Sequence, residues 1–143
     1  MNAYLDTSAL VKLAVEEPGT DELSEQKSEW TVLGAVSITY AELREAVAGL
    51  HRTGRLTAEA FLTSKTDLED AWREVTQIDI GEELVQEAGE FAERYSLRGY
   101  DAIQLAGLRA FDAPGRCVLA CWDKDMRAAA TKLGYEVFPT SIN

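Results

Sequence analysis

Hydrophobic residues along the chain follow two patterns: short apolar runs, and longer segments in which apolar positions recur every three or four residues. Short runs bounded by polar or turn residues are typical of buried strands, and the wider spacing is typical of amphipathic helices. The runs predict strands at 3–5, 35–37, 75–79, 117–122 and 136–138. The periodic segments predict helices at 8–15, 20–28, 40–52, 57–74, 82–95, 101–111 and 124–133.

The order of these elements predicts the fold class. Strands that alternate with helices favour a parallel sheet covered by helices on both faces. No low-complexity linker or internal repeat divides the chain, so we expect residues 1–143 to form a single α/β domain. Within it, Thr39 is expected to be the N-cap of the helix at 40–52.

Four acidic residues lie where such a sheet binds ligands. Asp6 directly follows the strand at 3–5, and Asp123 follows the strand at 117–122. Glu42 lies in the first turn of the helix after the second strand, and Asp101 opens the helix at 101–111. Ligands of doubly wound sheets bind beyond the carboxyl ends of the strands. We therefore expect Asp6, Glu42 and Asp123 to share one edge, with Asp101 joining them if its helix begins there.

Carboxylates gathered at one edge point to a particular chemistry. They repel one another, and their pKa values rise unless a cation neutralises them. Oxygen ligands without His or Cys select hard ions such as Mg²⁺ or Mn²⁺. Such ions orient water and stabilise charge on a phosphoryl group during in-line displacement. The four acids therefore fit metal-dependent phosphoryl chemistry.

Each acid also has a purely structural interpretation. Asp6 and Asp123 could cap the helices that follow them, and the helix dipole could stabilise Asp101. Glu42 could be a solvated helix residue, the usual environment of glutamate. Asp125 competes with Asp123 for a role at the site, but it falls inside its helix.

Net charge and aromatic residues narrow the expected partners. The formal net charge of −11 argues against a protein that coats nucleic acid through Lys and Arg. The charge is uneven, since 16–29 and 67–93 hold sixteen of the 25 acids, whereas 94–132 carries seven Lys or Arg against four Asp. Three aromatic residues flank the expected site and could stack on bases, although core packing is the commoner role: Tyr40, Tyr100 and Trp122.

Cysteine and histidine usage argues against other catalytic classes. If the run at 117–122 is a strand, Cys117 and Cys121 lie about 13 Å apart, beyond the roughly 7 Å that a disulfide spans. Both thiols should therefore stay unpaired. His51 is the only histidine, so neither a zinc site nor a His-based triad has its usual residues. The first apolar run contains Asp6 and Lys12, unlike a signal peptide or membrane span, so a cytoplasmic location without membrane contact is expected.

Four motifs resemble those of PIN domains. YLDTSALVKL at 4–13 resembles the family's opening, where a strand delivers an Asp followed by Ser or Thr near the metal. SITYAELREA resembles the second motif and supplies Glu42, and LRGYDAIQLAGL resembles the third and supplies Asp101. CWDKDMRAAATKLGYEV resembles the fourth and supplies Asp123, although Cys121 and Trp122 stand where a small hydroxyl residue commonly precedes that Asp.

The resemblance implies a three-layer α/β/α sandwich with a mostly parallel, five-stranded sheet and an Mg²⁺- or Mn²⁺-dependent endoribonuclease activity. The single-domain length is similar to that of VapC toxins, which implies a homodimer inhibited by a small VapB-type antitoxin. Asp6 and Asp101 would hold the principal ion, and Glu42 and Asp123 would complete its shell through water or bind a second ion transiently. Ser8, or as the second choice Thr7, would orient a ligand or water. Basic side chains that could contact RNA phosphate are Arg98, Arg44, His51, Arg52 and Arg55.

Rival interpretations fit the residues less well. A phosphatase of the haloacid-dehalogenase type needs a second Asp two positions after the first, where Ser8 stands. A response-regulator receiver needs paired acids and a late Lys that this sequence does not place. A catalytically silent PIN-like scaffold that binds RNA or protein stays open, because a fold can persist without its chemistry.

Overall fold

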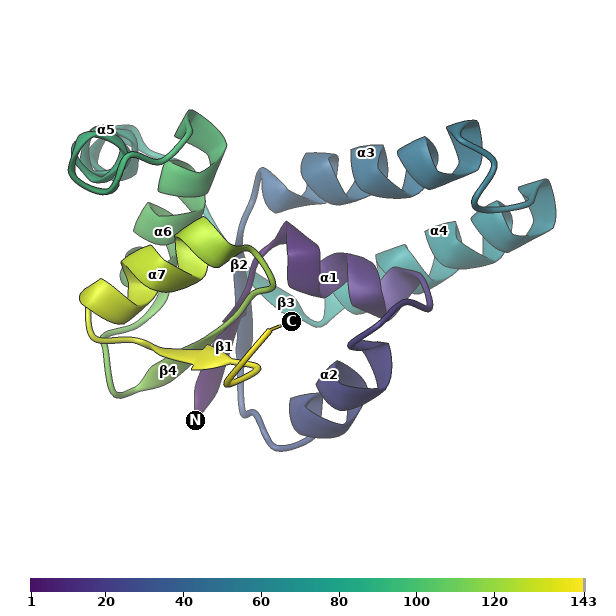
Figure 1. Ribbon diagram of the computed structural model, residues 1–143, viewed down its shortest axis with the longest axis horizontal. Helices are drawn as coiled ribbons and strands as arrows, with labels where there is room; N and C mark the ends of the chain where they lie inside the picture. The colour runs from purple at the N-terminus through teal and green to yellow at the C-terminus, as the bar shows by residue number, and fades with distance from the viewer. Residues whose placement is uncertain (143) are drawn as a thin grey trace.

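A five-stranded sheet runs through the centre of the computed structural model, which describes residues 1–142 (Figure 1). Its strand order is β3-β2-β1-β4-β5, and every pairing is parallel. The strands are β1 (Asn2–Leu5), β2 (Leu33–Val36), β3 (Val75–Ile78), β4 (Cys117–Ala120) and β5 (Glu136–Phe138). The predicted parallel sheet of five strands is confirmed, while the predicted domain end at residue 143 lies outside the described residues.

Helices cover both faces of the sheet. They are α1 (Thr7–Ala14), α2 (Thr20–Lys27), α3 (Thr39–Arg52), α4 (Ala58–Arg73), α5 (Glu82–Tyr95), α6 (Gly99–Phe111) and α7 (Lys124–Lys132). Each corresponds to a predicted helix, with ends that differ by at most two residues. Within residues 1–142, no helix combines the length and the apolar character needed to cross a membrane.

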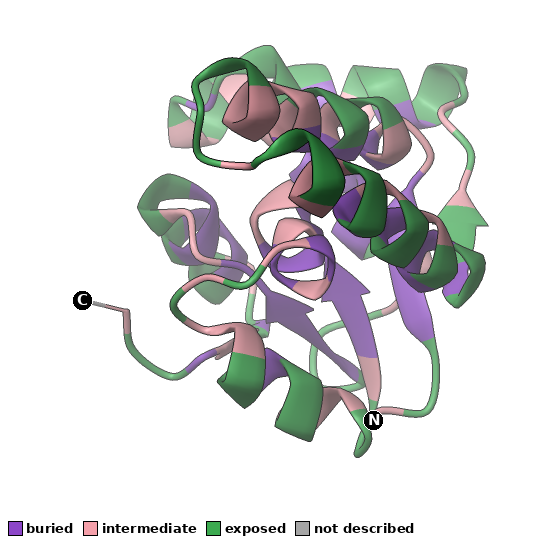
Figure 2. Cartoon of the chain, turned by 90° about the vertical axis from the view of Figure 1, so that its right-hand side faces the viewer, coloured by how far each residue is buried: buried purple, intermediate pink, exposed green. Residues whose placement is uncertain are grey.

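Two hydrophobic cores separate the layers. Successive side chains of a strand point to opposite faces, so Tyr4 enters the core formed with α5, α6 and α7, whereas Leu5 enters the core formed with α1 to α4. Both residues are fully buried. Figure 2 shows the resulting layers, with buried central strands and helices whose outer faces are exposed. The three-layer α/β/α sandwich is therefore confirmed.

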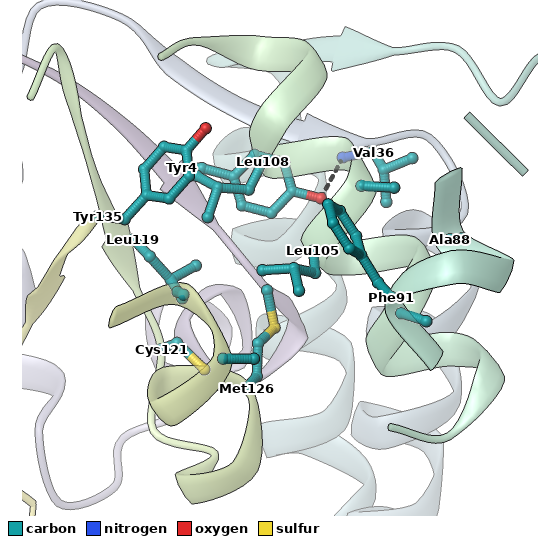
Figure 3. Packing of buried hydrophobic residues seen from close by; sticks show 14 of the residues in the cluster. Tyr4, Val36, Ala88, Phe91, Leu105, Leu108, Leu119, Cys121, Met126 and Tyr135 are labelled. Carbon is teal, nitrogen blue, oxygen red and sulfur yellow. Dashed lines mark hydrogen bonds between the residues drawn. The ribbon is translucent and has the colours of Figure 1, made fainter. Parts of the chain in front are cut away.

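Close packing fixes α6 against β1 and β2. Figure 3 shows the Tyr4 ring inside this core, with the Val36 N–H donating to its hydroxyl at 3.1 Å. A Cβ on Gly107 would lie 2.5 Å from Tyr4 Oη and 2.9 Å from Val36 Cβ. Because no side chain fits in that space, glycine lets α6 approach the sheet closely enough to bring its first turn to the strand ends.

The start of α3 differs from the prediction. Thr39 is the first residue of the helix, and Ile38 occupies the N-cap position without a side-chain hydrogen bond. The Thr39 side chain is fully buried, and its hydroxyl accepts a hydrogen bond from Gln104 Nε2 at 2.8 Å. The predicted N-cap role of Thr39 is wrong because a residue of α6 binds the hydroxyl that would have made the cap.

Candidate functional site

Asp6 lies at the carboxyl end of β1 and is the N-cap of α1. Its Oδ1 accepts hydrogen bonds from the Ala9 N–H at 3.1 Å and from Ser8 Oγ at 2.6 Å. Its Oδ2 accepts one from Cys121 Sγ at 2.9 Å. The capping interpretation is therefore correct for this residue, and the same contacts fix the orientation of a carboxylate that is only 5% exposed.

The surroundings of Asp6 disfavour its negative charge. The pKa of this carboxyl is raised to about 6, mainly by burial and in smaller part by the nearby charge of Asp123. The donors Cys121, Ser8 and Ala9 oppose this shift without cancelling it. A bound cation would supply the missing stabilisation, since it interacts favourably with the ionised form only.

Asp123 has a matching position at the end of β4. Its Oδ1 accepts from the Met126 N–H at 2.9 Å and caps α7, leaving Oδ2 outside the cap. Cys121 joins the two caps, because its Sγ accepts from the Asp123 N–H at 3.3 Å while donating to Asp6. Ser8 Oγ also accepts from the Trp122 N–H at 2.8 Å. A thiol thus links the ends of β1 and β4.

Both cysteines are free and buried, as predicted. Burial raises the pKa of each thiol, that of Cys117 to about 12. The proximity of Asp6 raises the pKa of Cys121 further. Cys121 therefore acts as a neutral hydrogen-bond donor toward Asp6.

Glu42 is held by a buried network that sequence reasoning did not identify. Gln104 Nε2 donates to Glu42 Oε1 at 3.0 Å and to Thr39 Oγ1 at 2.8 Å. The Tyr4 hydroxyl donates to Gln104 Oε1 at 2.8 Å, which fixes the orientation of the amide. Burial raises the pKa of Glu42, Gln104 lowers it, and the charge of Asp101 raises it.

Asp101 lies in the first turn of α6, two residues after the helix begins. Burial and the nearby charge of Asp123 raise its pKa, and Arg98 lowers it. The Arg98 side chain is 89% exposed and lies 3.7 Å from Asp101 Oδ2, so solvent weakens this ion pair. Asp125 also raises the pKa of Asp101, which means that this rival of Asp123 is close to the same edge.

Electrostatic repulsion acts between neighbouring pairs of the four predicted acids. The charge of Asp123 raises the pKa values of Asp6 and Asp101, and the charge of Asp101 raises the pKa of Glu42. The positive ends of α1, α3, α6 and α7 also meet at this edge and favour anions there. The edge, above the sheet in Figure 1, is thus acidic and formed by segments far apart in the sequence.

The donor set fits a hard divalent ion. Thr7 Oγ1 is buried, has no partner at hydrogen-bond distance among the described residues, and lowers the pKa of the neighbouring Glu42 as a donor. Within residues 1–142, no three His, Cys, Asp or Glu side chains are close enough to hold a metal as they stand. Mg²⁺ keeps several waters and is usually bound through one or two carboxylates, so it does not need a closed protein cage.

Several predicted RNA-contacting side chains have structural partners instead. Arg44 Nη1 donates to the Tyr40 hydroxyl at 2.8 Å and lies 3.3 Å from Glu69. The His51 ring stacks on Phe61 with a centroid distance of 4.5 Å. Among the predicted basic residues, Arg98 is the one paired with an acid of the edge.

The fold and its acidic edge define a three-layer α/β/α protein whose helix starts gather carboxylates at the carboxyl ends of the strands. The PIN domain family matches residues 3–131, and the chain belongs to this family. Ribonuclease VapC45 of Mycobacterium tuberculosis is 31% identical over 140 residues, 98% of this chain and 96% of the relative. The resemblance drawn from the four motifs is confirmed.

Solved structures show the same fold. PAE2754 from Pyrobaculum aerophilum has a TM-score of 0.70 and 19% identity, over 98% of this chain and 91% of that chain. A chain of a toxin–antitoxin complex from Klebsiella pneumoniae has a TM-score of 0.63 and 17% identity, over 99% of this chain and 97% of that chain. At these identities the comparison concerns the fold alone.

Proposed function

We propose that this protein is an Mg²⁺- or Mn²⁺-dependent endoribonuclease and the toxin of a VapBC-type pair. The observation that carries the proposal is the shared acidic edge, where repulsion links Asp6, Asp123, Asp101 and Glu42. A relative named as a ribonuclease matches the chain over almost its whole length. The acidic edge and this relative both support an enzyme that hydrolyses phosphodiester bonds.

Each acid has a distinct role in the proposed reaction. Asp6 and Asp101 would hold the ion, and Asp123 and Glu42 would contribute to its binding through water. Ser8 supports Asp6 through the 2.6 Å hydrogen bond to Oδ1. When bound, the ion supplies an activated water and stabilises the charge that develops on the phosphate.

The protein's own groups orient the substrate and move the proton. Glu42 accepts a proton from the attacking water, because Gln104 fixes Oε1 and burial raises the carboxyl pKa toward the working pH. Arg98 contacts the RNA phosphate, since its guanidinium is 89% exposed and its pair with Asp101 is long. These roles make the carboxylates the essential groups and Arg98 an accessory one.

Cleavage of total RNA with Mg²⁺, with Mn²⁺ and with EDTA tests the proposal. Wild-type protein should cleave only with the ion, and Asp101→Asn or Asp6→Asn should lower the rate at least about 100-fold, since such an ion contributes several kcal/mol to the transition state. Circular dichroism should show both variants folded. Cleavage by Asp101→Asn at the wild-type rate would contradict the proposal and leave the silent scaffold as the better interpretation.

The partner proposals follow from the same family. A short gene directly before this one is expected to encode a VapB-type antitoxin, and the active protein is expected to be a homodimer. Expression of the wild type alone should arrest growth, whereas co-expression with that neighbour, or the Asp101→Asn substitution, should restore it. Sedimentation analysis should give the mass of a dimer. A monomer with full activity would contradict the dimer proposal.

A further inference from the structure

A cavity of about 560 Å³ lies beside Glu42, and Tyr100 forms part of its wall. We propose that this cavity is a nucleobase-binding subsite in which Tyr100 stacks on an unpaired base next to the cleaved phosphodiester. The inference rests on the proposed function, because the base belongs to the RNA substrate of the same site. The volume of the cavity is within the roughly 300–1,000 Å³ that is typical of small-ligand pockets.

Tyr100 differs from the other aromatic residues near the site. Trp122 packs edge-on against Phe138 with centroids 6.0 Å apart, and Tyr40 packs against Trp72 with centroids 5.5 Å apart. The Tyr100 side chain is 59% exposed and has no aromatic partner among the described residues. Core packing, the ordinary role of such a residue, therefore does not account for it.

Most of the remaining wall is a stripe along the first turns of α3. Its members are three or four positions apart and so lie on one face of the helix: Ile38, Ala41, Glu42, Glu45 and Ala46. The alanine side chains are short and take up little of the cavity. An aromatic ring together with small apolar side chains suits the π-face of a base.

The charges of the cavity favour a base over a phosphate. Glu42 and Glu45 both line it, and two carboxylates repel a phosphate group. Carboxylates accept hydrogen bonds from the amino groups of bases. Adenine, cytosine and guanine carry an exocyclic amino group, whereas uracil has a single N–H between two carbonyls. The subsite should therefore prefer amino-bearing bases over uracil.

The position of the cavity next to the acids also fits this occupant. Thr7 lines the cavity beside Glu42, and its hydroxyl lowers the pKa of that carboxyl as a hydrogen-bond donor. Asp101 follows Tyr100 directly in α6, so a base on Tyr100 lies next to the proposed reaction centre.

Binding and cleavage of single-stranded RNA oligonucleotides test the subsite separately from catalysis. Ca²⁺ replaces Mg²⁺ for binding, measured as fluorescence anisotropy of a labelled strand. Tyr100→Ala should weaken binding about 5- to 150-fold, the loss expected from one base–aromatic stack, and should raise KM with kcat little changed. Tyr100→Phe and Tyr100→Trp should keep most of the affinity. Leu62→Ala, an exposed apolar residue of α4, is the matched control and should bind like the wild type.

A fluorescent base analogue measures stacking directly. An oligonucleotide with 2-aminopurine next to the cut should lose fluorescence on binding wild type, and much less on binding Tyr100→Ala. Mapping of cleaved ends should show adenine, cytosine or guanine preferred over uracil on one side of the cut, and Glu45→Gln should weaken that preference.

The outcomes separate the two proposals. RNA binding that depends on Tyr100 without cleavage in Mg²⁺ or Mn²⁺ would overturn the nuclease and leave the subsite. Cleavage and binding by Tyr100→Ala at wild-type values would overturn the subsite and leave the nuclease. If Tyr100→Ala changes the sedimentation mass but neither RNA binding nor cleavage, the subsite is overturned in favour of an interface with a second copy. If the wild-type protein binds no RNA, both the subsite and the nuclease are overturned.

Discussion

Gln104 Nε2 lies 3.0 Å from Glu42 Oε1, so one buried amide joins the second turn of α6 to the first turn of α3. Sixty-two positions separate the two residues along the chain. Gln104 is only 3% exposed, and its second hydrogen from Nε2 goes to Thr39. The orientation of a site carboxylate thus depends on a residue of the core.

Gln104→Leu should destabilise the protein and misorient Glu42. The substitution leaves the buried Thr39 and Tyr4 hydroxyls without this partner, at a cost of about 1–3 kcal/mol in unfolding free energy. Urea denaturation measures it, and RNA cleavage should fall as well. Gln86→Leu replaces an exposed residue of α5; it is the control and should change stability by less than about 0.5 kcal/mol. Equal effects of the two substitutions would contradict the role of the network.

Two helix glycines should respond to alanine in opposite directions. Gly107→Ala would place its Cβ 2.5 Å from Tyr4 Oη and 2.9 Å from Val36 Cβ, so we expect a loss of about 1–3 kcal/mol from overpacking. Gly89→Ala meets no atom within 4 Å and lies in the middle of α5, so it should stabilise the protein by about 0.5–1 kcal/mol. Thermal unfolding of both variants checks this, and a stabilising Gly107→Ala would show that α6 does not need its close approach.

Asp6 should make the metal-free protein less stable as pH rises. Its folded pKa is about 6 and its unfolded pKa is 3.8, so the folded state holds the proton more tightly. The stabilising contribution of that proton is fully present below pH 3.8 and is lost as pH rises through about 6. Asp6→Asn does not titrate, so its stability relative to wild type should increase by about 2 kcal/mol between pH 4 and pH 7.

Urea denaturation in EDTA across this pH range measures the difference. Leu62→Ala removes no titratable group and should differ from wild type by the same amount at every pH. A constant difference between Asp6→Asn and wild type from pH 4 to pH 7 would show that burial does not raise the pKa of Asp6.

Mn²⁺ should raise the melting temperature of the wild-type protein. An ion at about 100 times its Kd adds roughly 2.7 kcal/mol to the folded state, which corresponds to about 5–10 °C for a chain of this size. EDTA should reverse the shift, and Asp6→Asn should lose most of it. Asp70→Asn, an exposed acid of α4, should keep the full shift. A wild-type melting temperature that stays constant throughout the titration would favour the metal-free scaffold.

The helices and strands were predictable because their signals are local. Segment 82–95 has apolar residues at helical spacing, and α5 spans those residues. Ends were less certain, since α6 begins two residues before the predicted start at Asp101. Gly99 and Tyr100 carry no periodic signal of their own, and both are exposed in the first turn of α6.

The sequence by itself determined the sheet and the shared edge. Parallel strands bring their carboxyl ends to one side, so acids that directly follow strands must meet there; this holds for Asp6 and Asp123. The position of Glu42 at this edge was predictable from the start of the helix that follows the second strand. The motif order was sufficient to identify the family, because each motif is contiguous.

Only the tertiary structure decided which groups are engaged and which are free. Thr39 binds Gln104 instead of capping its helix, and Cys121 donates to Asp6 from 115 positions away. Tyr40 and Trp122 pack against other rings, while Tyr100 remains exposed. These outcomes depend on partners distant in the chain, whose distances are set by how the layers pack, and hydrophobic periodicity carries no information about them.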